Sequence, residues 1–254
     1  MGVLTSADSI DGARRKSTGY PDTPDCVRNY ELGAVRYGTN NSDVGHCKPM
    51  EAAAQRRQLA TLAQLVSAIE PVEADKLAQR LIDEFGSLGL VLASAGWKIA
   101  EVTGNHTLAG MLTASRAAVL EGLREEVSRS PINLSSPSFM RYLIAQMQGE
   151  DEEHLHVIFI DSNGRYIRDE RVASGDWTNV TVRLRPLFRR TMDLQAANLV
   201  LCHNHPSGDA NPSKADINFT NEVSNVARSL GIKLLDHMIV AGPAVFSMRN
   251  AGYL

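Results

Sequence analysis

The chain has 254 residues, of which 43% are hydrophobic and 22% charged, and its formal net charge is −3. These values are ordinary for a globular protein with one large or two modest domains, and they exclude a global basic field of the kind that nucleic-acid-binding proteins carry. No apolar run is long enough to cross a membrane, and the first residues lack the apolar core of a signal peptide.

Residues 1–50 are rich in Gly, Ser, Asp, Asn and Arg and show little apolar periodicity. We therefore expect a disordered or weakly ordered extension there. Two of the three cysteines, Cys26 and Cys47, lie in this segment, and the third is Cys202. They form no CxxC pair, which favours a reducing, cytoplasmic location over a disulfide framework.

Residues 51–130 have the pattern of a small helical domain. Apolar residues recur at three- and four-residue steps, beginning with Leu59, Leu62, Leu65, Val66 and Ile69. Gly86 ends one helix, short helices are expected at 88–92 and 98–102, and a longer one at 113–127. Ser-Pro pairs then mark residues 131–150 as a linker that carries a short helix at 139–147.

Residues 151–254 alternate between strand and helix patterns, which predicts an α/β domain of about a hundred residues. Two strands at 154–160 and 166–173 are joined by a turn that contains Asn163 and Gly164. A helix at 186–196, a strand at 199–202 and a helix at 212–230 follow. The final strands are expected at 232–240 and 245–248.

The most informative segment follows the strand at 199–202. His203 and His205 are two residues apart, so both side chains lie on one face of an extended chain. Asp216, in the first turn of the next helix, can reach back toward the two imidazoles. Two histidines, one carboxylate and one water suit a catalytic zinc ion, although manganese and iron accept the same donors. Ser213 and Asp216 also have the spacing of a helix capping box, and the two roles are compatible.

The spacing His203-x-His205, seven residues, Ser213, two residues, Asp216 resembles the JAMM motif of MPN-domain metallopeptidases. The sequence of residues 203–209, together with Pro212 and the downstream segment 234–240, resembles that of the RadC family of bacterial proteins. The resemblance implies an MPN fold in residues 151–254, a three-layer sandwich of a mixed sheet with flanking helices. It also likens residues 51–130, loosely, to a degenerate helix-hairpin-helix domain.

The resemblance further implies one zinc ion held by His203, His205 and Asp216, with one water completing the shell. It implies a glutamate that activates this water, five residues before a glycine, and Glu170 stands five residues before Gly175. The neighbouring Asp169 is the alternative, because only one of the two can face the metal. Ser213 would donate to the oxyanion. The expected reaction is cleavage of an amide, a peptide or isopeptide bond, in a peptide or protein substrate.

Several alternatives stay open at this point. His203-Asn204-His205 superficially resembles a metal-dependent HNH nuclease, and the helical domain could serve a DNA-binding accessory protein of repair or recombination. A catalytically silent MPN scaffold is a third possibility. The basic group Arg183, Arg185, Arg189 and Arg190 could face solvent or bind an acidic substrate. Asp236 and His237 form a second polar pair, either supporting the metal ligands or holding the core.

Overall fold

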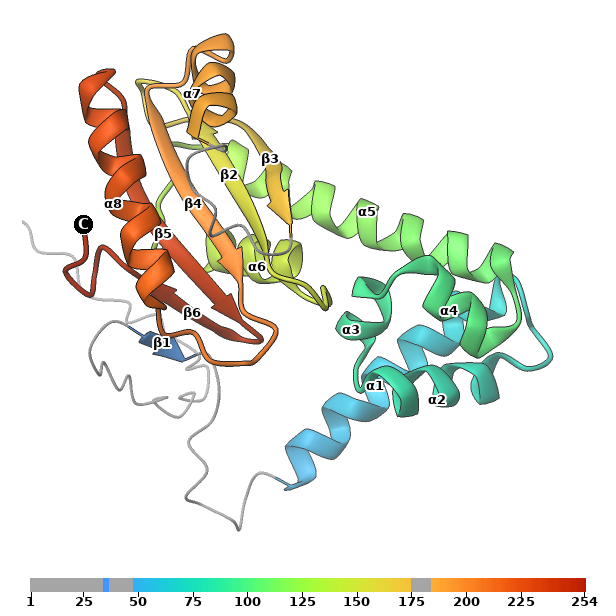
Figure 1. The fold of residues 1–254 in the computed structure, drawn as a ribbon. Helices are drawn as coiled ribbons and strands as arrows, with labels where there is room; N and C mark the ends of the chain where they lie inside the picture. The colour runs from blue at the N-terminus through green and yellow to red at the C-terminus, as the bar shows by residue number, and fades with distance from the viewer. Residues whose placement is uncertain (1–33, 37–47, 175–183) are drawn as a thin grey trace, which may run out of the picture.

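The computed structural model describes residues 34–36, 48–174 and 184–254 of the chain. In the first half of the described chain, short connections join a series of helices that pack on one another (Figure 1). These helices are α1 (Lys48–Ser67), α2 (Ala74–Phe85), α3 (Leu88–Ala93), α4 (Gly96–Thr103) and α5 (His106–Ser128). α6 (Pro137–Met147) follows and lies against the sheet of the second half.

The helical domain has an apolar core of its own, as the periodicity predicts. Its fully buried side chains come from all five helices and include Leu62, Leu81, Val91, Ile99 and Leu112. Polar side chains cap two of the helices: Ser87 accepts from the backbone N–H of Leu90, and Asn105 from that of Leu108. Such caps satisfy backbone donors that a helix start leaves without partners.

Helix α5 belongs to both halves of the molecule. Leu108 and Leu112 near its start lie in the helical core, whereas Val127 at its end packs with the residues beneath the sheet. In Figure 1 it extends from the helices of the first half to behind strand β3 of the sheet. The predicted helix at 113–127 was too short at its N-terminal end, because the helix begins about two turns earlier, after the Asn105 cap.

The second half is built on a mixed sheet with the strand order β1-β6-β5-β4-β2-β3 in the described part of the chain. The strands are β1 (Ala34–Arg36), β2 (His154–Ile160), β3 (Tyr166–Ser174), β4 (Asn198–Asn204), β5 (Lys233–Ala241) and β6 (Ala244–Ser247). Central strands β4 and β5 run parallel, and every other neighbouring pair is antiparallel. A parallel pair needs a crossover, which α8 (Lys214–Ser229) supplies.

Helices cover both faces of this sheet, so the domain has three layers (Figure 1). One face, with Leu155, Leu199 and Leu201, packs against α8 and α7 (Leu184–Asp193). The other face, with Ile158, Val200 and Cys202, packs against α6 and the end of α5. β2 and β4 are buried along nearly their whole length, which explains the apolar runs at 157–160 and 199–202.

The predicted fold class, an α/β three-layer sandwich with a mixed sheet preceded by a helical domain, is confirmed. Most expected elements are present within a few residues, but β4 continues through Asn204, so His203 lies within the strand rather than beyond it. In the segment expected to be weakly ordered, residues Ala34–Arg36 form β1 at the sheet edge, and most of residues 1–50 lies outside the described ranges. Among the described helices, none is long and apolar enough to span a membrane.

Candidate metal centre

The structure brings His203, His205 and Asp216 together at the end of β4. His203 occupies the penultimate position of this strand and is the Cα partner of Leu155 on β2 and of Ile239 on β5. His205 follows the strand directly, and its backbone N–H donates to the Val240 carbonyl at 2.8 Å. Asp216 lies in the first turn of α8 and is buried. Two buried strands therefore fix the histidines, and a helix start presents the carboxylate.

Ser213 and Asp216 form the capping box that their spacing predicted. The Ser213 hydroxyl accepts from the Asp216 backbone N–H at 3.1 Å, and the Asp216 carboxylate accepts from the Ser213 N–H at 2.6 Å. These two hydrogen bonds hold the Asp216 side chain toward the end of β4. The capping box therefore holds Asp216 where a metal ligand is needed, and its roles as cap and as ligand are compatible, as expected from the sequence.

The spacing of the donor atoms suits a small divalent cation. The Nε2 atoms of His203 and His205 lie 2.8 Å apart, and the Asp216 oxygens lie 3.4 Å from the first and 3.6 Å from the second. Ligands at about 2.0–2.1 Å from a tetrahedral zinc ion are separated by about 3.3 Å. In the described part of the chain, these three residues are the only group of at least three acidic, histidine or cysteine side chains whose donor atoms lie within 4.8 Å of one another.

The local electrostatics keep His203 and Asp216 in forms that bind metal, whereas His205 must lose a proton to do so. Burial, with the neighbouring His205, holds the pKa of His203 well below its ordinary value, so this ring is neutral. Burial also lowers the pKa of His205, but hydrogen bonding to Asp216 and to the Asp209 carbonyl outweighs it and raises the pKa. Burial raises the pKa of Asp216, yet hydrogen bonds from His205 and Ser213 leave it lowered, so this side chain is a carboxylate.

Asp169 and Glu170 lie on opposite faces of the sheet. Asp169 is buried on the α6 side, where Tyr166 and Arg124 both donate to it. Glu170 lies on the same side as α7 and accepts three hydrogen bonds from Arg190, which lower its pKa. Of the two carboxylates that the sequence left open, Glu170 is the one on the same face of the sheet as His203.

The sheet register does not bring Glu170 to the triad. Glu170 is the Cα partner of Val157, which is the partner of Leu201, two residues before His203. With β2 lying between the two strands, usual sheet spacings separate the Cα atoms of Glu170 and His203 by about 12 Å. Arg168 also forms an ion pair with Glu170, at 2.9 Å. The role of Glu170 as general base remains a prediction.

A second acidic residue, Glu153, stands much closer to the histidines in the register. It immediately precedes β2, two residues before Leu155, the strand partner of His203. Its negative charge is one of the groups that raise the pKa of His205. Glu153 carries no signal of its own in the sequence, because only the pairing of β2 with β4 brings it toward the histidines.

Asn204 fixes the backbone on both sides of Glu153. Its amide oxygen accepts from the His154 N–H at 2.8 Å, and its amide nitrogen donates to the Glu152 carbonyl at 3.0 Å. Asn204 is buried and lies between the two histidines of the motif. The residue between the ligands therefore ties the Glu153 segment to the end of β4.

The structure also places most of the other residues singled out in the sequence. Asp236 accepts hydrogen bonds from the Ser247 hydroxyl and from the N–H groups of His237 and Arg249, so it holds the turn after β6. Cys202 is fully buried, and burial raises the pKa of its thiol. Of the four arginines, Arg190 binds Glu170, Arg185 and Arg189 are exposed on α7, and Arg183 lies outside the described residues.

Comparisons with known proteins show the family of the chain. Residues 134–253 match the family described as a RadC-like JAB domain. A UPF0758 protein of Rhodobacter capsulatus is 35% identical over 191 residues, which cover 75% of this chain and 89% of that protein. A UPF0758 protein of Ruegeria pomeroyi is 31% identical over 75% of this chain and 85% of its own length. JAB domains are of the metal-dependent hydrolase type, and this chain belongs to the RadC family.

Proposed function

We propose that the protein is a zinc-dependent hydrolase of the JAMM type that cleaves an amide bond, peptide or isopeptide, in a peptide or protein substrate. The observation that carries this proposal is the convergence of His203, His205 and Asp216 within 4.8 Å at the end of a buried strand. Two imidazoles and one carboxylate leave one position of a tetrahedral shell open to water, as catalytic zinc sites do.

Zinc, when bound here, supplies a Lewis acid that lowers the pKa of a coordinated water toward neutrality. The chain's own residues then divide the remaining work. A carboxylate beside the ligands accepts the proton of the attacking water and returns it to the leaving amine. The Ser213 hydroxyl already accepts the Asp216 N–H, so its own proton is available to a developing oxyanion.

We propose Glu153 for the carboxylate, ahead of Glu170. Asn204 holds the Glu153 segment against the end of β4, whereas Arg190 and Arg168 already engage Glu170. Glu153→Gln is therefore expected to lower kcat by about 10²–10⁴-fold with zinc affinity retained. Glu170→Gln serves as the matched control and is expected to stay within a few-fold of the wild type. The opposite ranking of these two variants would restore Glu170 as the general base.

The hydrolase proposal is tested with a defined peptide pool. The full chain, loaded with zinc, is incubated with a casein digest, and new amino termini are counted by mass spectrometry. We expect new termini with the wild type and none with His205→Ala or after chelation. Equal cleavage by His205→Ala, or no cleavage by the zinc-loaded wild type, would contradict the proposal. Plasmid DNA incubated in parallel tests the nuclease alternative.

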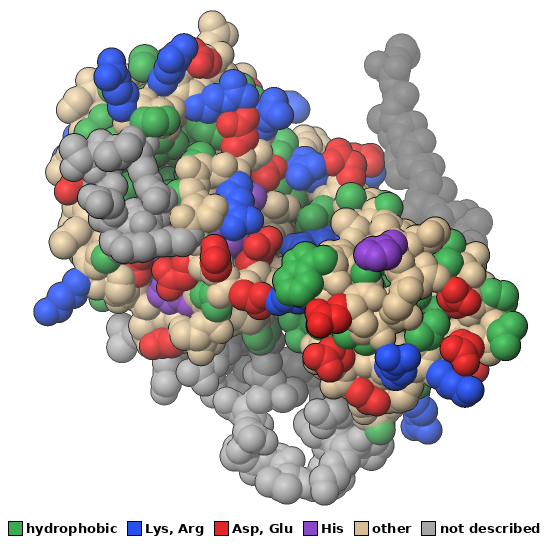
Figure 2. All heavy atoms as spheres, turned by 45° about the vertical axis from the view of Figure 1, so that its right-hand side comes forward, with side chains coloured by type: hydrophobic (Ala, Val, Ile, Leu, Met, Phe, Trp, Pro, Cys, Tyr) green, Lys and Arg blue, Asp and Glu red, His purple; other side chains and the backbone are tan. Residues whose placement is uncertain are grey.

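The described structure gives no support to the nuclease or DNA-binding alternative. His203 lies on the central strand β4 and His205 directly follows it, and a helix rather than a hairpin turn connects β4 to its parallel neighbour β5. Asn218 and Asn221 on that helix are exposed. Acidic and basic side chains are interspersed over the face drawn in Figure 2. DNA binding through phosphates would need a concentrated basic surface.

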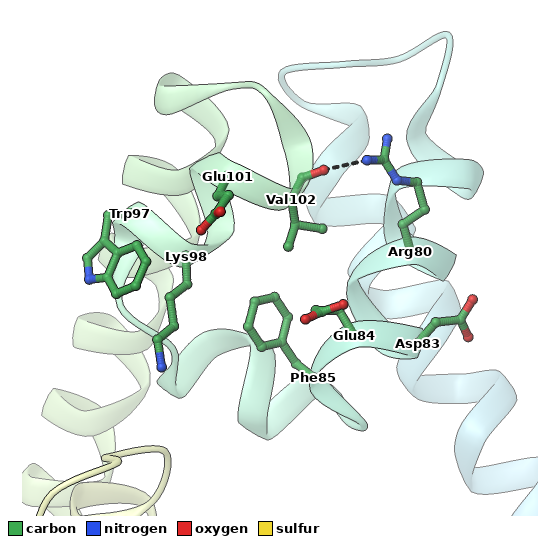
Figure 3. A pocket seen from close by; sticks show the side chains of 8 residues that line it. All are labelled: Arg80, Asp83, Glu84, Phe85, Trp97, Lys98, Glu101 and Val102. Atoms are coloured by element: carbon green, nitrogen blue, oxygen red, sulfur yellow. Dashed lines mark hydrogen bonds between the residues drawn. The ribbon is translucent and has the colours of Figure 1, made fainter.

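The helical domain carries an open pocket of about 790 Å³ whose lining is mainly acidic and aromatic (Figure 3). Its charged side chains comprise three carboxylates and two cations, and Trp97 is 65% exposed at its edge. Both cations have partners: Arg80 donates to the Val102 carbonyl and Lys98 pairs with Asp151. This lining disfavours phosphate, so the pocket does not support a DNA-binding role for the domain.

A further inference from the structure

A chain of hydrogen bonds runs behind the metal centre and returns to it. His203 Nδ1 lies 2.8 Å from His237 Nε2, and His237 Nδ1 lies 2.6 Å from Thr220 Oγ1. The Thr220 hydroxyl lies 2.5 Å from the backbone carbonyl of Asp216, one turn earlier in α8. His203, His237 and Thr220 are completely buried. The chain therefore begins on one metal ligand and ends on the backbone of another, sheltered from water.

The direction of these hydrogen bonds follows from counting protons. A threonine hydroxyl has one proton, and Thr220 points it at the Asp216 carbonyl, which is the usual pattern for a helical threonine. The sulfur of Met248, at 3.4 Å, is a weaker acceptor. The Thr220 oxygen then accepts from His237 Nδ1–H. A neutral imidazole with its proton on Nδ1 has a lone pair on Nε2.

That lone pair sets the state of His203. His237 Nε2 accepts from His203 Nδ1–H, which leaves the lone pair of His203 on Nε2, the atom that faces His205 and Asp216. The reverse direction would place a proton on His203 Nε2 and block its use as a ligand. His205 needs no such chain, because its Nδ1 donates directly to the Asp209 carbonyl at 2.6 Å. The His203 Nε2 lone pair then faces His205 Nε2 at 2.8 Å beside the Asp216 carboxylate, and a bound cation would take the place of the proton that His205 Nε2 shares with these two groups.

We propose that Thr220 and His237 are positioning residues that hold His203 in its Nδ1–H tautomer and thereby set the affinity of the centre for its metal. This inference rests on the proposed metal site and extends it to two residues that touch neither metal nor substrate. Partners of this kind fix the orientation of a ligating imidazole, and losing one weakens metal binding by about 10–100-fold.

Thr220→Val is the sharpest test, because valine keeps the shape of threonine and removes only the hydroxyl. Zinc affinity, measured by competition with a chelator, is expected to fall about 10–100-fold. In the zinc-free variant, ¹⁵N chemical shifts of the imidazoles are expected to show a mixture of tautomers at His203 and His237. Thr220→Ser restores a hydroxyl and is expected to recover zinc affinity to within a few-fold.

Thr191→Val is a matched control. Thr191 is equally buried, and its hydroxyl donates to the carbonyl four residues earlier, that of Leu187, at 2.8 Å on α7. Both variants lose the same type of bond, but only Thr220→Val is expected to change zinc affinity. Wild-type affinity and a single Nδ1–H tautomer in Thr220→Val would overturn the inference.

Two further outcomes keep the inference separate from the proposed function. A wild-type protein that binds no zinc would contradict the metal centre itself, whatever the tautomers are. If Thr220→Val does not fold, the zinc-free wild type decides the matter: a proton on Nε2 of His203 would overturn the inference, and a proton on Nδ1 would support it.

Discussion

The double role of Asp216, as helix cap and as metal ligand, leads to a prediction that separates the two. Ser213→Ala removes the acceptor of the Asp216 N–H but leaves the carboxylate in place. Asp216→Asn removes the charge but keeps an oxygen that can accept from the Ser213 N–H, now at 2.6 Å. The first change removes the cap and leaves all three metal donors present, whereas the second alters one of the donors.

The expected magnitudes differ in their dependence on zinc. Loss of the Ser213 cap lowers the free energy of unfolding by about 1 kcal/mol, with or without metal. Zinc at one hundred times its Kd raises the free energy of unfolding of the wild type by about 2.7 kcal/mol. For a folded unit of this size, the zinc term raises Tm by about 5–10 °C. Asp216→Asn is expected to abolish most of this rise.

Thermal unfolding of the wild type and both variants, each with zinc and with a chelator, measures these differences. Ser213→Ala is expected to unfold at a lower temperature in both conditions, with the zinc-dependent rise preserved. Asp216→Asn is expected to show almost the same Tm in both. An equal zinc-dependent rise in Asp216→Asn and the wild type would show that Asp216 is a cap and not a ligand.

Two further predictions concern the scaffold around the site. Gly149 has a φ of +83°, and a Cβ there would lie 2.3 Å from the Cβ of Ala93 in the helical domain. Gly149→Ala is therefore expected to lower the free energy of unfolding, measured with urea, by about 2 kcal/mol or more. An unchanged urea midpoint would contradict the close contact. Tyr166 and Arg124 donate to Asp169, and together with His156 and Tyr142 they outweigh the effect of burial and hold its pKa well below the ordinary value. Because the unfolded chain then takes up a proton that the folded chain does not, wild-type stability is expected to be full above about pH 4 and to fall below it by up to about 1.4 kcal/mol per pH unit. Asp169→Asn is expected to flatten this slope, and identical acid unfolding of the two proteins would refute the assignment.

Local sequence patterns predicted most of the fold, because most elements carry their own signal. Periodic apolar residues marked the helices, and unbroken apolar runs marked β2 and β4, which are buried on both faces. The start of α5 was misplaced because one side chain, Asn105, determines it. β1 gave no signal of its own, since three residues form a strand there only by pairing with β6.

At the candidate site, too, contacts between residues near in sequence could be predicted, whereas contacts that depend on strand pairing could not. His203, His205 and Asp216 lie within fourteen consecutive positions, so strand geometry and helix capping were enough to bring them together. Glu153 depends on the pairing of Leu155 with His203, and the contact of His237 with His203 depends on the parallel pairing of β4 with β5. Neither register is readable from a single sequence, so neither contact was predicted.

The most direct test of the metal centre is an anomalous difference map, recorded at the zinc edge from crystals of the full chain grown with zinc. One strong peak is expected in contact with Nε2 of His203, Nε2 of His205 and a carboxylate oxygen of Asp216. Zinc bound only elsewhere in the crystal, with these three side chains free of it, would contradict the metal centre and the hydrolase proposal together.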